Sequence, residues 1–125
     1  MLKPIEVVRA LLPLIIMTYA QEHSFHGYAL IKMLRKRLDV YFGPSTIYPI
    51  LNELSDLGML RGKWEMSERR RPIKVYYITQ EGREVAGQLN ATLNTTIQVI
   101  SNFNGKNDLE IVRPKSPHSF WVTVK

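Results

Sequence analysis

The sequence predicts a mainly α-helical protein with one small β-hairpin, which is an α+β fold. Apolar residues recur at helical spacing over most of the chain, two short runs rich in aromatic and branched residues interrupt them, and a long helical pattern follows. The predicted elements are helices over 5–22, 26–38 and 45–57, strands over 60–66 and 73–78, and a last helix over 80–104. This order is that of a winged helix-turn-helix domain, which we place at 1–79.

Composition restricts the class of protein. The chain has 125 residues and 45% hydrophobic content, which suits one compact domain with an appendage. It carries 17 Lys and Arg against 11 Asp and Glu, a formal charge of +6, so we expect an anionic partner, nucleic acid before a membrane surface. Cysteine is absent from the sequence, which excludes disulfides and thiolate metal sites and favours a cytoplasmic location.

The most apolar run, LLPLIIMTYA at 11–20, is shorter than the roughly 20 residues that a membrane-spanning helix needs, so we expect no membrane partner. A signal peptide is disfavoured because Pro13 interrupts the run and no clear small-residue cleavage site follows. Pro4 and Pro13 both suit a first helical turn. One interpretation is therefore a short lead-in helix and a second, buried helix that starts near Leu12.

The helix over 26–38 is expected to begin after a Ser24 cap and to bury a stripe formed by Leu30, Ile31 and Leu34. Basic residues crowd its C-terminal end, where they complement the helix dipole. The dipole alone explains such a cluster, so contact with a nucleic-acid backbone is an equally weighted alternative for Lys32, Arg35 and Lys36.

The helix over 45–57 has an uncharged outer face at its N-terminal end. Ser45 is the expected N-cap, Gly58 the expected stop, and a stripe that runs from Ile47 to Leu57 the expected core face. Pro49 at the fourth helical position removes only one early hydrogen bond, the one to the Ser45 carbonyl. Free amides, hydroxyls and an Asn side chain suit contact with phosphates and bases, and the candidate residues are Ser45, Thr46, Tyr48, Pro49 and Asn52. The alternative for Tyr48 is a ring folded onto the edge of the core.

The two strands form a hairpin with a protruding tip at 67–72. Residues 61–76 hold six basic side chains against two acidic ones, a net +4, so most of the excess charge lies in this hairpin. Phosphate contact is the commonest use of clustered arginines, and a merely solvated loop is the alternative. The candidate backbone-binding residues of this wing are Lys63, Arg69, Arg70, Arg71 and Lys74.

The last helix is predicted to begin after a Thr79 N-cap and to end near Phe103. Charged residues are absent over 85–105, which is unusual for a solvated helix and indicates packing on more than one side. We therefore expect a C-terminal dimerisation helix and a homodimer, formed through a stripe that contains Leu89, Leu93, Ile97, Ile100 and Phe103. The tail over 105–125 has no pattern that assigns its structure.

Three runs, FHGYALIKML, STIYPILNELSDLGML and IKVYYITQEGRE, resemble the PadR family of winged-helix transcriptional regulators over about residues 10 to 90. The family shows a His-Gly-Tyr helix start, a Tyr-Pro pair inside the recognition helix and a Tyr-Tyr-x-x-Thr-x-x-Gly exit from the second wing strand. Tyr48 and Pro49 match the recognition-helix pair. His26, Gly27 and Tyr28 match the helix start, and we expect them to be structural.

The resemblance implies a sequence-specific regulator of double-stranded DNA, usually a repressor, that binds a palindromic operator as a homodimer. The last helix, often with the N-terminal helix, would form the interface, and some members are released by a small aromatic or cationic effector bound near it. This chain departs from the family at Ile73, where relatives commonly have a basic residue although Lys74 follows here. Its tail from Gly105 has no family counterpart.

Other classes of function are weaker. An enzyme is disfavoured because the three histidines lack metal-ligand spacing with acids and no phosphate loop or nucleophile motif occurs, so we expect no cofactor and no metal. A winged-helix module for protein interaction or RNA binding stays the alternative, although the arginine tip and the acid-free helix start favour duplex DNA. Trp64, Tyr19 and several Met residues could line a ligand pocket, but residues of these types are more often core.

Overall fold

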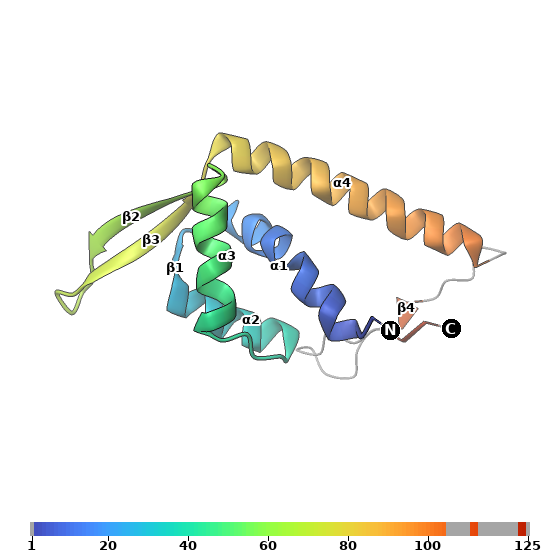
Figure 1. The fold of residues 1–125 in the computed structure, drawn as a ribbon, viewed down its shortest axis with the longest axis horizontal. Coiled ribbons are helices and arrows are strands. Elements are labelled where there is room, and N and C mark those ends of the chain that lie inside the picture. Colours follow the sequence, from blue (N-terminus) through green and yellow to red (C-terminus); the bar gives the residue numbers. More distant parts are fainter. Residues whose placement is uncertain (1, 105–110, 113–122, 125) are drawn as a thin grey trace.

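The computed structural model describes residues 2–104, 111–112 and 123–124. Its elements are α1 (Pro4–Ala20), β1 (Phe25–His26), α2 (Gly27–Leu38), α3 (Pro44–Asp56), β2 (Leu60–Met66), β3 (Pro72–Ile78), α4 (Gln80–Phe103), β4 (Ile111–Val112) and β5 (Thr123–Val124). Figure 1 shows α1, α2 and α3 gathered at the base of a projecting β2–β3 hairpin, with α4 leaving the root of that hairpin above α1. The predicted α+β fold class, a winged helix-turn-helix, is confirmed.

α1 is one continuous helix, so the interpretation as a lead-in helix and a second helix is wrong. Pro13 lies inside α1, where a proline costs about 3 kcal/mol through its lost hydrogen bond and its clash with the preceding turn. The helix continues because Leu12 and Ile16, before and after the proline, are both fully buried in the core. None of the helices within residues 2–104 is both long enough and apolar enough to cross a membrane.

α2 is capped by His26 and not, as predicted, by Ser24. The imidazole Nδ1 of His26 accepts a hydrogen bond from the Ala29 backbone N–H at 3.2 Å. His26 belongs to β1 and pairs with Val75, which holds its backbone in the extended conformation that an N-cap requires. The predicted stripe of α2 is confirmed, since Leu30, Ile31 and Leu34 are all buried.

α3 begins at Pro44 with Gly43 as its N-cap, so the predicted Ser45 cap is wrong. Proline suits the first helical position because its φ is fixed near the helical value and its missing N–H needs no partner there. Pro49 is consequently the sixth helical residue, and the hydrogen bond it removes is still the one to the Ser45 carbonyl. Gly58 follows the helix with a φ of 76°, as expected for a glycine stop.

The core lies between α1, α2 and α3, and its largest fully buried side chains are Val8, Leu12, Ile16, Leu30, Leu34, Ile47 and Leu51. Leu57 was predicted to join the stripe of α3 but is exposed, because it is the C-cap residue beyond the last turn. The predicted stripe is otherwise kept, with Ile50 partly buried against the core.

The main sheet has three antiparallel strands in the order β1, β3, β2, of which β1 was not predicted. Phe25 in β1 pairs with Tyr76, and their rings lie 5.8 Å apart in a stacked arrangement. Met66 pairs with Pro72, so the hairpin loop is 67–71, one residue shorter than predicted. β4 and β5 pair with each other, and the rest of the 105–125 tail lies outside the described residues.

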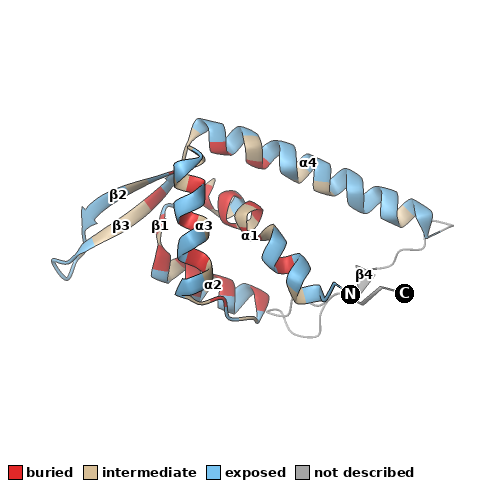
Figure 2. Ribbon diagram, in the orientation of Figure 1, coloured by how far each residue is buried: buried red, intermediate tan, exposed pale blue. Residues whose placement is uncertain are grey.

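α4 starts as predicted, with the Thr79 hydroxyl accepting a hydrogen bond from the Gly82 N–H at 3.0 Å. A Cβ on Gly82 would collide with the Met59 carbonyl oxygen, so this close approach to the preceding loop requires glycine. Beyond this first turn, Ala86 is the last buried residue of the helix. Figure 2 shows most of α4 coloured as exposed surface.

Candidate nucleic-acid interface

The N-terminal half of α3 presents a surface without acidic side chains. Its first turn contains no acid, and Glu53 and Asp56 both lie in its second half. The positive end of the helix dipole attracts anions, so this end of α3 favours a phosphate. All five candidate residues reach the surface, with Ser45, Tyr48, Pro49 and Asn52 exposed and Thr46 half-buried.

Tyr48 lies against the start of α2. A Cβ built on Gly27 would stand 2.6–2.7 Å from the Tyr48 ring and hydroxyl, so any larger residue there would displace the ring. Tyr48 nevertheless remains 39% exposed. The ring therefore packs on the edge of the domain with one side and meets solvent with the other. The His-Gly-Tyr and Tyr-Pro runs noted in the sequence meet in this single contact.

A hollow of about 410 Å³, which we call the wing hollow, lies between α3 and the β2–β3 hairpin. It brings Tyr48 and Asn52 of α3 together with Lys74 of β3. Its lining also includes Tyr28, Trp64 and Tyr76. Burial raises the pKa of Tyr76 above its ordinary value, and the nearby Tyr48 raises it further. A tyrosine is already neutral at physiological pH at its ordinary pKa of about 10, and a raised pKa leaves that state unchanged, so the Tyr76 hydroxyl can donate a hydrogen bond.

The two wing lysines leave opposite faces of the hairpin. Lys74 is opposite Trp64 in the strand register, so these two side chains share the face that borders the wing hollow. Lys63 precedes Trp64 in β2 and leaves the other face, because successive side chains of a strand alternate. The structure thus brings Lys74, and not Lys63, beside α3.

The loop at 67–71 exposes the three arginines at positions 69–71. Ser67 organises the loop, since its carbonyl accepts from the Arg70 N–H at 2.9 Å and its hydroxyl accepts from the Arg71 N–H at 3.1 Å. Arg70 has a φ of 56°, a left-handed conformation that costs a non-glycine residue about 1–2 kcal/mol. Arg70 thus occupies a position where the backbone would favour glycine.

The cations of α2 form a second exposed basic group, made of Lys32, Arg35 and Lys36. The Lys32 Nζ lies 5.3 Å from the centre of the Tyr28 ring, and the Arg35 guanidinium lies 5.8 Å from that of Tyr41. Such cation–π contacts contribute about 0.5–1 kcal/mol at exposed sites. Tyr28 and Tyr41 thus hold these charges close to the start of α3, with which they share a cavity lining.

The predicted dimerisation stripe is an exposed apolar surface in the single chain. Leu93 is half-buried, whereas Leu89, Ile97, Ile100 and Phe103 are exposed, Phe103 by 86%. At its N-terminal part α4 contacts α1, where the Asn90 side-chain amide donates to the Thr18 hydroxyl at 3.1 Å. The stripe therefore continues beyond the part of α4 that the other described residues cover.

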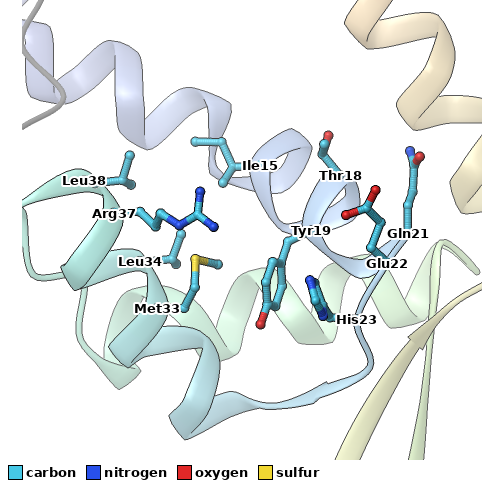
Figure 3. A pocket seen from close by; sticks show the side chains of 10 residues that line it. All are labelled: Ile15, Thr18, Tyr19, Gln21, Glu22, His23, Met33, Leu34, Arg37 and Leu38. Carbon is cyan, nitrogen blue, oxygen red and sulfur yellow. The ribbon is translucent and has the colours of Figure 1, made fainter. Parts of the chain in front are cut away.

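The residues considered for a ligand pocket do not share one site. Trp64 is 69% exposed, so the preference for a core role is wrong for this residue, because the hairpin carries it beyond the helical body. Tyr19 is half-buried and lines a cavity of about 380 Å³ between α1 and α2 (Figure 3). There its ring stacks on His23 at 4.7 Å, and Arg37 reaches toward α1 from the opposite side. Within the described residues, no cluster of His, Asp and Glu could hold a metal ion.

Comparison with solved structures gives similar folds. The chain is similar to a PadR family transcriptional regulator from Eggerthella lenta, with 24% identity and a TM-score of 0.72 over 82% of this chain and 88% of that one. It is also similar to a PadR-like transcriptional regulator from Bacillus cereus, with 20% identity and a TM-score of 0.72 over 80% of this chain and 97% of that one. Bacillus subtilis PadR, solved in complex with operator DNA, is 21% identical, with a TM-score of 0.58 over 63% of this chain and 46% of that one. At these identities the likeness shows the fold.

Comparison with curated proteins gives no significant match. The profile of the transcriptional regulator PadR-like family matches residues 16–88, which span most of α1, all of α2 and α3, the hairpin and the start of α4. This family is one of regulators and not of enzymes. Because the match covers more than half of the chain, the protein belongs to the PadR-like family of transcriptional regulators.

Proposed function

We propose that this protein binds double-stranded DNA in a sequence-specific manner and regulates transcription, as a repressor, from a palindromic operator. α3 lies in the major groove in this proposal, and the loop at 67–71 contacts the flanking backbone. The observation that carries it is the wing hollow, where Lys74 of the wing stands beside Tyr48 and Asn52 of α3. Bacillus subtilis PadR, which shares the fold, was solved with operator DNA, and this supports the same class of partner here.

The charges support the same orientation. The helix start of α3 has no acid, the wing loop carries three exposed arginines, and the α2 cations stand beside the α3 start. Phosphate contacts from such groups position a protein on the duplex, whereas polar side chains on the recognition helix read the bases. We assign positioning to Lys32, Arg35, Lys36 and the wing cations, and reading to Asn52 and its neighbours on α3.

A homodimer completes the proposal, because one copy of α3 reads only half of a palindrome. The exposed stripe on α4 supports this assembly, since a contiguous apolar surface on a soluble domain marks an interaction site. Two exposed apolar residues near the N-terminus, Leu2 before α1 and Val7 within it, would extend the same interface. A second copy of the chain is the partner whose stripe has the same chemistry.

Selection of bound duplexes from a random DNA pool tests the proposal directly. We expect a palindrome whose two halves lie one helical turn apart or a multiple of it, about 34–36 Å per turn. Affinity should fall steeply as salt rises, and duplex RNA of the same sequence should compete poorly. Failure to bind any duplex at low salt would overturn the proposal, because phosphate contacts are strongest there. A reporter driven by the selected palindrome should be less active with the protein than without it.

Two single variants separate positioning from reading. Arg70→Ala should weaken binding to every duplex and lower the salt slope by about one unit, since it removes one phosphate contact. Asn52→Ala should change which sequences are preferred and leave the salt slope unaltered. Equal losses on selected and random duplexes for both variants would contradict this division. Fluorescence anisotropy of labelled duplexes gives both quantities.

A small-molecule effector stays a prediction of the family resemblance. The cavity in Figure 3 has a suitable volume, since ligand pockets range over about 300–1,000 Å³. We propose to screen small aromatic and cationic compounds by thermal shift and to repeat the screen with Tyr19→Ala. A ligand of this cavity should raise the melting temperature of the wild type only.

A further inference from the structure

Trp64 has a place in the fold that neither core packing nor the turn chemistry of the hairpin explains. Its side chain is 69% exposed, which is unusual for the largest apolar residue type. It lies on the face of the hairpin that borders the wing hollow, together with the equally exposed Met66. The ring thus forms an apolar wall of a site whose other wall is α3.

Lys74 and its surroundings complete the floor of this site. The Lys74 Nζ lies 5.6 Å from the centre of the Tyr76 ring, which holds the ammonium over the floor. Gly62 leaves room for the lysine stem, because a Cβ at that position would collide with the Lys74 Cε. The opposite wall is the Tyr48 ring, whose other side packs against Gly27.

The chemistry of the wing hollow matches a sugar–phosphate strand. Its lining contains one lysine, aromatic rings on both sides and no acidic residue. A phosphate pairs with an ammonium, and the apolar faces of deoxyribose rings pack on aromatic side chains. A purely apolar ligand would leave Lys74 without an anion, and a free phosphate would leave Trp64 without a contact. A nucleic-acid strand, in which phosphates and sugar rings alternate, provides an anion for Lys74 and an apolar contact for Trp64.

We propose that Trp64, Lys74 and Tyr48 form a clamp for one DNA strand between the wing and the recognition helix, in which Trp64 packs on the sugars and Lys74 pairs with a phosphate. This inference rests on the proposed duplex-binding function and adds a contact residue to it. The site is continuous with both parts of the proposed interface, since its lining includes Asn52 of α3 and Pro72 next to the arginine loop. Trp64 contributes affinity for any sequence, because it contacts sugars and not base edges.

The fluorescence of Trp64 can report the contact. The sequence has two tryptophans, so Trp121→Phe leaves Trp64 as the single emitter, and Trp121 lies outside the described residues. On titration with the selected palindrome, the Trp64 emission should change and should become protected from acrylamide. Both effects should saturate at the DNA concentration at which the anisotropy of the labelled duplex saturates.

Substitutions distinguish the roles of the two residues. Trp64→Ala should lower affinity about fivefold or more without changing the salt slope, because the ring neutralises no phosphate. Lys74→Ala should lower the salt slope by about one unit, and Trp64→Phe should recover most of the affinity. Tyr77→Ala is the matched control, since it removes an aromatic ring from the opposite face of the same hairpin and should leave DNA affinity unchanged.

The outcomes separate this proposal from the one it rests on. Wild-type affinity for the palindrome in Trp64→Ala, with unaltered Trp64 emission in the Trp121→Phe protein, would overturn the clamp and leave DNA binding in place. A wild-type protein that binds no duplex would overturn both. Melting curves of Trp64→Ala should coincide with those of the wild type, so a loss of affinity would report the contact and not the fold.

Discussion

α3 and α4 differ in how much of their apolar surface the rest of the structure buries. α3 has 13 residues and buries Ile47, Leu51 and Leu54 against the rest of its own chain. α4 has 24 residues and buries Gly82 and Ala86, while the apolar stripe on its later turns stays exposed (Figure 2). The winged-helix body is thus completed within one chain. No other described residue covers the later turns of this stripe, so substitutions in the two helices should have different kinds of effect.

The largest effect is expected from charges placed in the stripe. The double variant Ile97→Asp and Ile100→Asp would bury four carboxylates in a dimer, at a cost of several kcal/mol for each. Sedimentation should then show the 14.5 kDa single chain in place of a species of twice that mass, with the helical content of the body kept. The control is Ala91→Asp with Gln98→Asp, which adds the same charge to the other side of α4, where both residues are exposed. A dimer that survives the stripe variant would show that α4 is covered in another way.

A core deletion in α3 comes next. Leu51→Ala should lower the free energy of unfolding by about 2–5 kcal/mol, because Leu51 is fully buried and its loss leaves a cavity. Urea denaturation at fixed protein concentration measures this change. Leu57→Ala, at the exposed C-cap of the same helix, should stay within about 0.5 kcal/mol of the wild type. Similar losses in both variants would mean that the body is not the independent unit described above.

The two inner glycines of α4 sharpen the contrast between its start and its remainder. Gly82→Ala should destabilise by about 1–3 kcal/mol, since its new methyl group meets the Met59 carbonyl. Gly87→Ala should stabilise by about 0.5–1 kcal/mol, because nothing lies within 4 Å of the added Cβ and alanine favours helix. Thermal melting at equal concentrations compares them. The same sign for both variants would be inconsistent with an α4 whose first turn packs closely on the Met59 loop while Gly87 faces open space.

The smallest expected effect concerns the wing tip. Arg70→Gly should raise stability by about 0.5–1 kcal/mol, because glycine adopts the left-handed conformation without the steric cost but loses more entropy on folding. Duplex affinity should fall in the same variant, as for Arg70→Ala. A gain in stability with a loss in binding would show that the body accepts local strain where it is proposed to face DNA. Unchanged DNA affinity would remove Arg70 from the proposed contacts.

Periodicity and end signals predicted most of the fold, because they are local. Helical spacing located α2, α3 and α4, and Thr79 and Gly58 marked two helix ends. The errors came from tertiary contacts. β1 has two residues, too few to show a period, and exists because β3 offers it an edge. His26 caps α2 only because β1 fixes its backbone, and Pro13 is tolerated only because both sides of it are buried.

The candidate interface was predictable in composition and not in arrangement. Charge located the wing arginines and an acid-free helix start, and both are exposed as predicted. The separation of Lys63 from Lys74 depends on the strand register, which a loop one residue shorter than expected determines. Trp64 could not be placed from its residue type, since tryptophan is usually buried and the projection of the hairpin leaves it at the surface.

The first turn of α4 has a mechanical consequence. The Thr79 N–H donates to the Met59 carbonyl at 3.1 Å, its hydroxyl donates to the Gly58 carbonyl, and Gly82 packs on the same loop. These contacts therefore connect the end of α3, the root of the wing and the start of α4 to one another. In the proposed dimer, a rotation of α4 about these contacts would move the winged-helix body of the same chain with it. A change in the crossing angle between the two copies of α4 would alter the distance between the two copies of α3. Substitutions at the α4 interface would then change which operator spacing the dimer fits, although they lie far from the DNA.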